Sequence, residues 1–152
     1  MIIKVVGAFI AIVTFAILLE TPRKYLWCAG VVGGVGWLAY LLSTVLDANE
    51  ILATFISACV IALVSHIFAR VFKAPVTVFL IAGILPTVPG AGMYRIVYYI
   101  IAGDSDMSMY YLITTLELAG VIAIAIFIVD TFFRVFQREW DKKRIDKKGK
   151  LL

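Results

Sequence analysis

The sequence has little charge for its length. Only 16% of the 152 residues are charged and 63% are hydrophobic, whereas soluble domains have about 25% charged and about 45–50% apolar residues. This composition excludes a soluble enzyme, a disordered regulator and a secreted disulfide scaffold. We therefore expect an integral membrane protein, in which about 20 apolar residues make one helical span.

Cysteine and histidine are scarce. Cys28 and Cys59 lie in separate apolar runs, at different expected depths, so no disulfide is predicted and both are interpreted as small packing residues. Two cysteines and one histidine cannot form a zinc site. No Ser, His and acid set converges at one depth. We therefore expect no metal, no cofactor and no catalytic residue, and the chain is not predicted to be an enzyme.

Long apolar runs, in contrast, are abundant and predict five transmembrane helices. The predicted spans cover residues 2–19, 25–46, 51–72, 76–102 and 110–135. The first run lacks a small-residue cleavage motif, so it is expected to be an uncleaved span rather than a signal peptide. The predicted fold is an all-α integral membrane protein with a single membrane domain over residues 1–152, ending in a basic tail at 136–152.

Basic residues are absent from two of the four predicted loops. The second and fourth loops carry Asp47, Glu50, Asp104 and Asp106 but no Lys or Arg, and twelve of the fourteen Lys and Arg residues lie in the other two loops or the tail. The positive-inside rule then places the N-terminus outside and the tail in the cytoplasm. We expect the tail to fix the topology and to contact anionic lipid. A partner-docking role for the tail is left open, and nucleic-acid binding is not expected.

The fourth predicted span contains helix-breaking residues. Pro86 and Pro89 lie three residues apart and Gly90 follows, so the helix is predicted to break near the midplane, over residues 86–92. Unwound backbone at membrane depth needs protein or a polar cavity around it. The half-helix that restarts near Gly90 presents free N–H groups and a positive dipole end, the arrangement by which many transporters bind anionic groups.

Arg95 follows this break and falls within the predicted span. A guanidinium at membrane depth costs at least ~2.5–3.5 kcal/mol on insertion scales, so we expect an anionic partner. That partner is either a substrate carboxylate or Glu117, which lies at a matching distance from the outer boundary in the fifth span. A weakly paired, buried Glu117 would also be able to carry a proton. The candidate substrate-binding residues are Thr87, Gly90, Gly92, Tyr94, Arg95 and Glu117.

Other polar and small residues follow helical spacing. Thr54, Ser57 and Ser65 form a stripe on the third span that favours helix packing, with the lining of a path as the alternative. His66 and Asp130 both fall near the cytoplasmic boundary, where an interfacial histidine is favoured over a proton relay. Four glycines cluster in the second span and favour close helix contact: Gly30, Gly33, Gly34 and Gly36.

The run from Leu85 to Arg95, with its Pro-x-x-Pro-Gly and following tyrosine, resembles the threonine/serine exporter (ThrE-like) family. The five-span size and basic tail are similar to the small membrane subunit of split members of that family, so the resemblance covers nearly the whole chain. It implies secondary export of threonine and serine, or of dicarboxylates such as succinate. It also implies a larger membrane subunit as partner.

The leading hypothesis is therefore a subunit of a secondary transporter in the bacterial inner membrane. It would export a small carboxylate-bearing metabolite, coupled to the proton gradient. Whether the isolated chain also forms a homo-oligomer is left open. The alternative is a non-transporting assembly or scaffold subunit, whose broken helix only packs against the larger partner.

Overall fold

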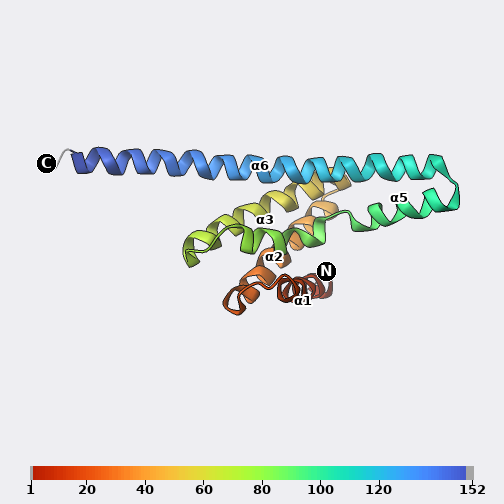
Figure 1. Ribbon diagram of the computed structural model, residues 1–152, viewed down its shortest axis with the longest axis horizontal. Helices are drawn as coiled ribbons and strands as arrows, with labels where there is room; N and C mark the ends of the chain where they lie inside the picture. Colours follow the sequence, from red (N-terminus) through yellow and green to blue (C-terminus); the bar gives the residue numbers. More distant parts are fainter. Residues whose placement is uncertain (1, 150–152) are drawn as a thin grey trace.

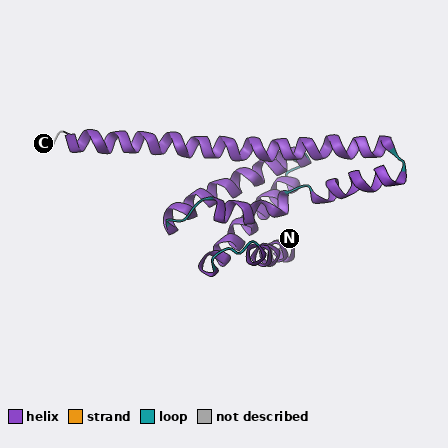
Figure 2. Cartoon of the chain, in the orientation of Figure 1, coloured by secondary structure: helices purple, strands orange, loops and turns teal. Residues whose placement is uncertain are grey.

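The computed structural model describes the backbone of residues 2–149 and the side chains of residues 2–136. Within this range every regular element is a helix and no strand forms (Figure 2). In chain order the elements are α1 (Ile2–Leu18), the 3-10 turn η1 (Arg23–Tyr25), α2 (Leu26–Val45), α3 (Glu50–Phe72), α4 (Thr77–Ile84), the 3-10 turn η2 (Leu85–Thr87), α5 (Gly90–Ala102) and α6 (Ser105–Gly149) (Figure 1).

Three helical segments of the described chain are long and apolar enough to cross a membrane. They are Arg23–Val45, Glu50–Phe72 and Ser105–Phe136, and Thr77–Thr87 with Gly90–Ala102 would be a fourth if this pair, bent by 53°, makes one span. The remaining apolar helix, α1, has 17 residues, somewhat fewer than the ~20 of a typical span. The protein is thus an all-helical membrane protein with three or four candidate spans, and the predicted count of five depends on α1.

Glycines let α2 pack closely between α1 and α3. A Cβ atom on Gly33 would overlap the side chain of Ile12 in α1, and one on Gly36 would overlap Ile61 in α3. Helices in lipid associate through such close packing rather than through the hydrophobic effect. The glycine cluster of the second predicted span therefore fixes the order α1–α2–α3 in the bundle.

Helix α4 packs against α2 and α3 through an aromatic cluster. Phe79 is fully buried, and its ring centroid lies 5.4 Å from that of Tyr25 and 5.9 Å from that of Phe68, both in edge-to-face geometry. Such geometry aligns the positive edge of one ring with the negative face of the next. This cluster holds the short α4 against the end of α3.

The last helix is longer than the sequence predicts at both ends. It begins at Ser105 rather than near residue 110, because the Asp104 carboxylate accepts a hydrogen bond from the backbone N–H of Met107 (3.0 Å) and caps the first turn. Gly103, with φ of 78°, reverses the chain so that α5 and α6 lie antiparallel. The helix also continues beyond residue 135 to Gly149. The side chains of the predicted basic tail, from residue 137 onward, lie outside the described residues.

The break after η2 lies level with the first turns of α3. Residues 86–89 share a cavity with Glu50 and Thr54, in the first turns of α3, whereas Gly83 already lies near Ile61, in the middle of α3. Residues 114, 115 and 118 of α6 line the same cavity, and they lie well inside the Ser105–Phe136 candidate span. The predicted position of the break near the midplane stays a prediction.

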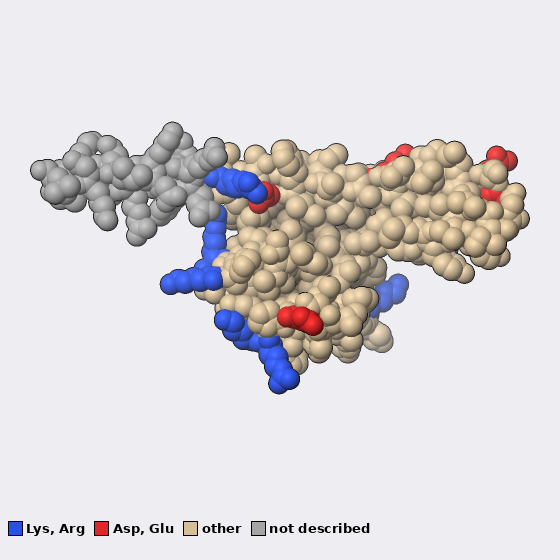
Figure 3. All heavy atoms as spheres, in the orientation of Figure 1, with Lys and Arg blue, Asp and Glu red and all other residues tan. Residues whose placement is uncertain are grey.

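Beyond the break, α5 and residues 105–115 of α6 form an arm that extends past the other helices (Figure 1). No residue of α5 is buried, and Tyr94 and Ile101 are 69% and 82% exposed. Most of the visible Lys and Arg atoms lie at the end of the molecule opposite the arm, with one further group on the arm side of the bundle, and Asp and Glu atoms are visible both along the arm and on the bundle (Figure 3). We call the end with Asp47, Glu50 and Asp104 the acidic end, and the end with Arg70, Lys73 and Arg134 the basic end.

Candidate functional site

The helix break is built from residues that satisfy one another locally. The hydroxyl of Thr87 donates to the carbonyl of Ile84 (2.7 Å), and the N–H of Val88 donates to the carbonyl of Leu85 (3.3 Å). Val88 is extended, and Pro89 then leads into α5, whose first turn has no side-chain cap. The start of α5 is therefore a helix N-terminus with its positive dipole end uncovered by any side chain.

A cavity of about 370 Å³ lies beside this break, and we call it the acidic-end cavity. Its walls come from α2, α3, the break itself, α5 and α6. The polar lining residues are mostly hydroxyl-bearing and include two buried threonines, Thr54 and Thr115, which are 4% and 8% exposed. Two lining residues are charged, Glu50 and Arg95. The cavity thus offers both signs of charge together with hydroxyl groups.

Arg95 is held by a tyrosine and not by a carboxylate. One of its terminal nitrogens donates to the hydroxyl of Tyr111 (3.3 Å), and its guanidinium carbon lies 5.1 Å from the centroid of the Tyr111 ring. Tyr111 in turn stacks on Tyr99, with centroids 5.5 Å apart. This contact orients the guanidinium and leaves its charge uncompensated, because a neutral phenol accepts a hydrogen bond without neutralising the cation.

Glu50 brings the opposite charge to the same cavity. It is the first residue of α3, and its position is fixed by Asn49, whose side chain accepts a hydrogen bond from the N–H of Leu52 (2.8 Å). Next to it the cavity is lined by Tyr40, whose ring stacks on that of Trp37 (5.1 Å between centroids). The sequence predicts Glu50 in a loop. Because Asn49 caps the helix, Glu50 is instead in the first turn of α3, where it forms part of the cavity wall.

The structure brings together only part of the predicted site. Five predicted residues line the acidic-end cavity, namely Pro86, Thr87, Pro89, Gly92 and Arg95. Gly92 also has a packing role, because a Cβ atom there would overlap the hydroxyl of Thr115 in α6. Three predicted residues are not part of the lining: Gly90, Tyr94 and Glu117. Tyr94 is exposed and stacks on Tyr98 instead.

The expected pairing of Arg95 with Glu117 does not form. No ion pair joins the two among the side chains that the structure describes, and Glu117 is exposed. Glu117 is the residue before Leu118, about 100° away from it around the helix axis, and it lies at the edge of the α6 face that lines the cavity. Equal distance from a membrane boundary does not put two side chains on facing sides of their helices.

Sequence reasoning missed Glu50 and Tyr40 as cavity residues. Glu50 was counted only as an acidic loop residue that sets the orientation, although Asn49 before it is a typical helix N-cap and places Glu50 in the first turn. For Tyr40, no local motif marks the position. In the described part of the chain, no three His, Cys, Asp or Glu side chains come together as a metal site.

Comparison with known proteins identifies the family. The family model described as Threonine/Serine exporter, ThrE, matches residues 4–132. No curated protein and no solved structure matches the chain. The match covers most of the 152 residues. It reaches into each of the five segments that the sequence predicts to cross the membrane and ends at residue 132, within the fifth. This chain therefore belongs to the threonine/serine exporter family, a family of membrane transporters.

Proposed function

We propose that this chain is the small subunit of a proton-coupled exporter and that its acidic-end cavity binds the exported molecule. Membership in the threonine/serine exporter family supports the transport function. The observation that carries the choice of site is the presence of a guanidinium, Arg95, and a carboxylate, Glu50, on the walls of one cavity. With α1 counted as a span, the chain crosses the inner membrane five times and the acidic end faces outward.

These two charges match a free amino acid. The α-carboxylate of the substrate would bind the Arg95 guanidinium, which is suited to bidentate binding of carboxylates. The ammonium group of the substrate would bind the Glu50 carboxylate. The hydroxyl of threonine or serine finds partners in Thr54 and Thr115, which are buried in the cavity wall. A dicarboxylate such as succinate fits Arg95 equally well, but its second carboxylate would face Glu50 and be repelled. We therefore favour threonine or serine over a dicarboxylate.

Glu117 supports the need for a larger partner subunit. It lies well inside the Ser105–Phe136 candidate span and is exposed. A carboxylate that faces lipid in the middle of a span costs ~2.5–3.5 kcal/mol on insertion scales. The neighbouring arm is also uncovered, with exposed Tyr94, Val97 and Tyr98 on α5. We propose that the larger membrane subunit of the exporter packs on the arm and supplies a partner for Glu117.

A non-transporting assembly subunit is the second candidate, because the same exposed arm would serve it. The two candidates differ in whether the acidic-end cavity determines what is exported. The experiment loads cells with labelled threonine or labelled succinate and measures efflux with this chain alone, with the larger family subunit alone, and with both. We expect efflux of threonine only when both subunits are present.

The substitution Glu50→Gln then tests the cavity. Loss of a hydrogen-bonded charge costs about 1.5–3 kcal/mol, so threonine efflux should fall about 10- to 100-fold while succinate efflux holds or rises. Asp47→Asn is the matched control, because Asp47 lies in the loop just before α3 and is not among the residues that line the cavity. The assembly role would be established instead if Glu50→Gln leaves threonine efflux unchanged and the larger subunit alone also exports threonine.

A further inference from the structure

A second cavity, of about 410 Å³, lies at the basic end between α3, α4 and α6. We call it the basic-end cavity. Its walls are mostly apolar, with Leu80, Ile126 and Phe127 among them. Two titratable side chains also line it, His66 from α3 and Asp130 from α6. Neither of them takes part in the site around Arg95.

The two cavities share two of their walls, α3 and α6. Along α3, Thr54 lines the acidic-end cavity and His66 the basic-end cavity, with Ala58 between them. Ala58 packs with Ile122 of α6 and Ile84 of α4 in one apolar cluster. On α6 the order is the same: residues 110–118 contribute to the acidic-end cavity and residues 123–130 to the basic-end cavity. The structure therefore has two separate recesses with an apolar cluster between them. The acidic-end recess is lined largely by hydroxyl groups, and the basic-end recess is mostly apolar with His66 and Asp130 on its wall.

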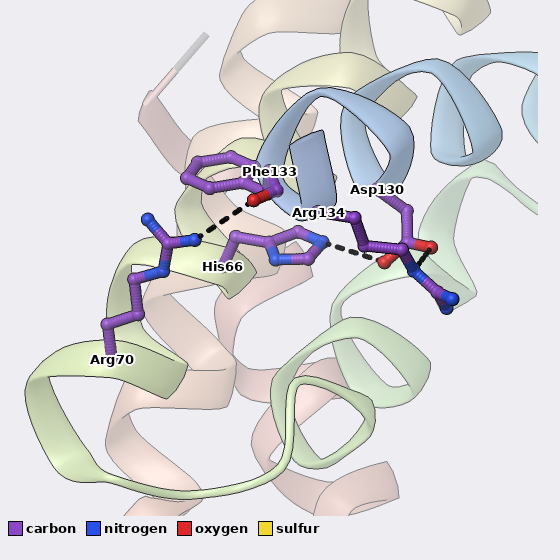
Figure 4. Close-up of polar contacts among 5 residues, drawn as sticks. All are labelled: His66, Arg70, Asp130, Phe133 and Arg134. Carbon is purple, nitrogen blue, oxygen red and sulfur yellow. Dashed lines mark hydrogen bonds and ion pairs between the residues drawn. The ribbon is translucent and has the colours of Figure 1, made fainter. Parts of the chain in front are cut away.

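His66 is held in a defined position at the basic-end cavity (Figure 4). The residue is 8% exposed, and its Nε2 atom lies 3.5 Å from Oδ1 of Asp130. Its ring stacks face to face on Phe133, with centroids 4.5 Å apart and planes at 5°. The imidazole thus joins α3 to α6 at the point where the cavity lies between them.

The charged groups around His66 come from two of the three packed helices. On α6, Asp130 also accepts a short ion-pair contact from Nε of Arg134 (2.7 Å) at its other oxygen. On α3, Arg70 lies over the Phe133 ring (4.5 Å) and donates to the Phe133 carbonyl (3.4 Å). The α4 residues that line the cavity carry no charge. One oxygen of Asp130 is therefore satisfied by Arg134, and the other faces the imidazole.

We propose that His66, paired with Asp130, is the proton-binding site of this exporter. The proposal rests on the proposed transport function and names the residue that carries the coupled proton. An incoming proton binds the ring nitrogen that has none, which gives an imidazolium of charge +1, and no other bond forms or breaks. The imidazolium then forms a full ion pair with Asp130 and holds α3 against α6. Loss of the proton to solvent weakens this contact and loosens the basic end.

Histidine is suited to this role because its charge changes between pH 5 and 8. Across two pH units centred on its midpoint, the imidazolium fraction falls about tenfold. A coupling step governed by His66 should follow that curve, whereas a structural ion pair between an arginine and a carboxylate would stay charged throughout this range.

Because the chain contains a single histidine, proton binding is directly observable. We would label the full-length chain with ¹⁵N-histidine in lipid nanodiscs and record the imidazole signals between pH 5 and 8. The signals should move from the neutral to the imidazolium position within this range. In Asp130→Asn, which removes the carboxylate that stabilises the cation, a smaller imidazolium fraction is expected at each pH. Signals that stay constant between pH 5 and 8 would overturn the proposal.

Export provides the second measurement. In cells or vesicles that contain both subunits, threonine efflux should follow the imidazolium fraction when the pH on the basic-end side is changed between 5 and 8, a change of about tenfold over the two pH units around the midpoint. His66→Gln should reduce this variation to less than about twofold. Ser65→Ala is the matched control for packing, since Ser65 is the buried neighbour of His66 on α3, and it should keep the wild-type pH response.

The outcomes separate the two proposals. If the wild-type pair exports nothing, the proposed function is wrong, whatever the histidine signals show. If the wild-type pair exports and His66→Gln, inserted at the wild-type level, keeps the full pH response, the coupling site lies elsewhere and this inference is wrong. Retained export with a flattened pH response, together with a titrating imidazole, supports it.

Discussion

The acidic-end and basic-end cavities both have α3 and α6 in their walls, but their charged residues are arranged in opposite ways. At the acidic end, Glu50 and Arg95 line one space without pairing, and the guanidinium is held by a neutral tyrosine. At the basic end, Asp130 is in contact with both Arg134 and His66. Glu50 and Arg95 are both exposed, so their charges are accessible to a ligand, and we propose the first cavity as the binding site for that reason. The second cavity has instead a contact between helices, through His66 and Asp130.

This contrast is also seen in the helices that bear the charges. The pair at the basic end joins α3 to α6, two helices that pack along their length, and its stacked Phe133 fixes the ring. The charges at the acidic end come from the first turn of α3 and from α5, which packs mainly on α6. Two residues on elements that do not pack on each other can remain apart until a substrate bridges them.

Removal of the cation at the acidic end should have the largest effect. We expect Arg95→Ala to lower threonine efflux by about 100-fold or more, since the substrate carboxylate then loses its charged hydrogen-bond donor. Arg95→Lys keeps the charge but not the planar fork, so an intermediate loss of about tenfold is expected. The measurement is efflux of labelled threonine from cells with both subunits, normalised to the amount of protein in the membrane.

Tyr111→Phe is the matched control for this prediction. It removes the hydroxyl that accepts from Arg95 but keeps the ring beneath the guanidinium, so a loss of only a few-fold is expected. If Arg95→Ala exports threonine at the wild-type rate, the acidic-end cavity does not bind the substrate through Arg95. The contrast between the two cavities would then be wrong.

The spacing between α5 and α6 should matter next. Gly92→Ala places a Cβ atom against the Thr115 hydroxyl, and overpacking of this kind costs about 1–3 kcal/mol. We expect lower thermal stability in detergent and a several-fold loss of efflux, because α5 carries Arg95. The double variant Gly92→Ala with Thr115→Ala removes the clashing group and should recover most of the stability, as coupled neighbours do in a double-mutant cycle. An additive loss in the double variant would show that the close approach at Gly92 is unimportant.

Much of the fold could be predicted from hydropathy and charge. The apolar runs correspond to α1, α2, α3 and the apolar part of α6, and the glycines of the second run meet α1 and α3. These features are local, because composition and spacing along one helix determine them. Family membership was likewise readable from a short motif around Pro86 and Pro89, since the match to the family covers residues 4–132.

The cavity lining was predictable only in part, for geometric reasons. Five predicted residues on the break and on α5, Arg95 among them, line it because they are close in sequence, whereas Gly90 and Tyr94 on the same helix do not. Glu50 and Tyr40 enter from other helices, and sequence offers no measure of how α2 and α3 turn toward the break. Glu117 was chosen by depth alone, and the rotation of α6 about its axis places it outside the cavity. Depth follows from counting residues, whereas facing direction depends on packing.

Substitution of Glu117 should have a smaller effect, on assembly with the larger subunit and not on substrate binding. Because it is exposed and does not line the acidic-end cavity, Glu117→Gln should leave the preference for threonine over succinate unchanged. If its role is to meet the larger subunit, the amount of that subunit that copurifies should fall by a few-fold. Loss of a single polar contact between membrane helices is worth only about 0.6 kcal/mol on average. If Glu117→Gln changes the substrate preference and assembly with the larger subunit stays normal, Glu117 is part of the binding site after all.

The smallest effect is expected at Arg134, although its contact with Asp130 is the shortest ion pair of the described side chains. The two residues are one helical turn apart on α6, and the Arg134 side chain is 76% exposed. Exposed pairs of this kind contribute about 0.3–0.5 kcal/mol. Arg134→Gln should therefore change the free energy of unfolding by no more than about this amount and should leave the pH response of efflux intact, because Oδ1 of Asp130 still faces His66. The opposite result would be a pH response that is lost in Arg134→Gln but kept in His66→Gln. It would mean that the pH response depends on the Asp130–Arg134 pair within α6 and not on the contact between α3 and α6.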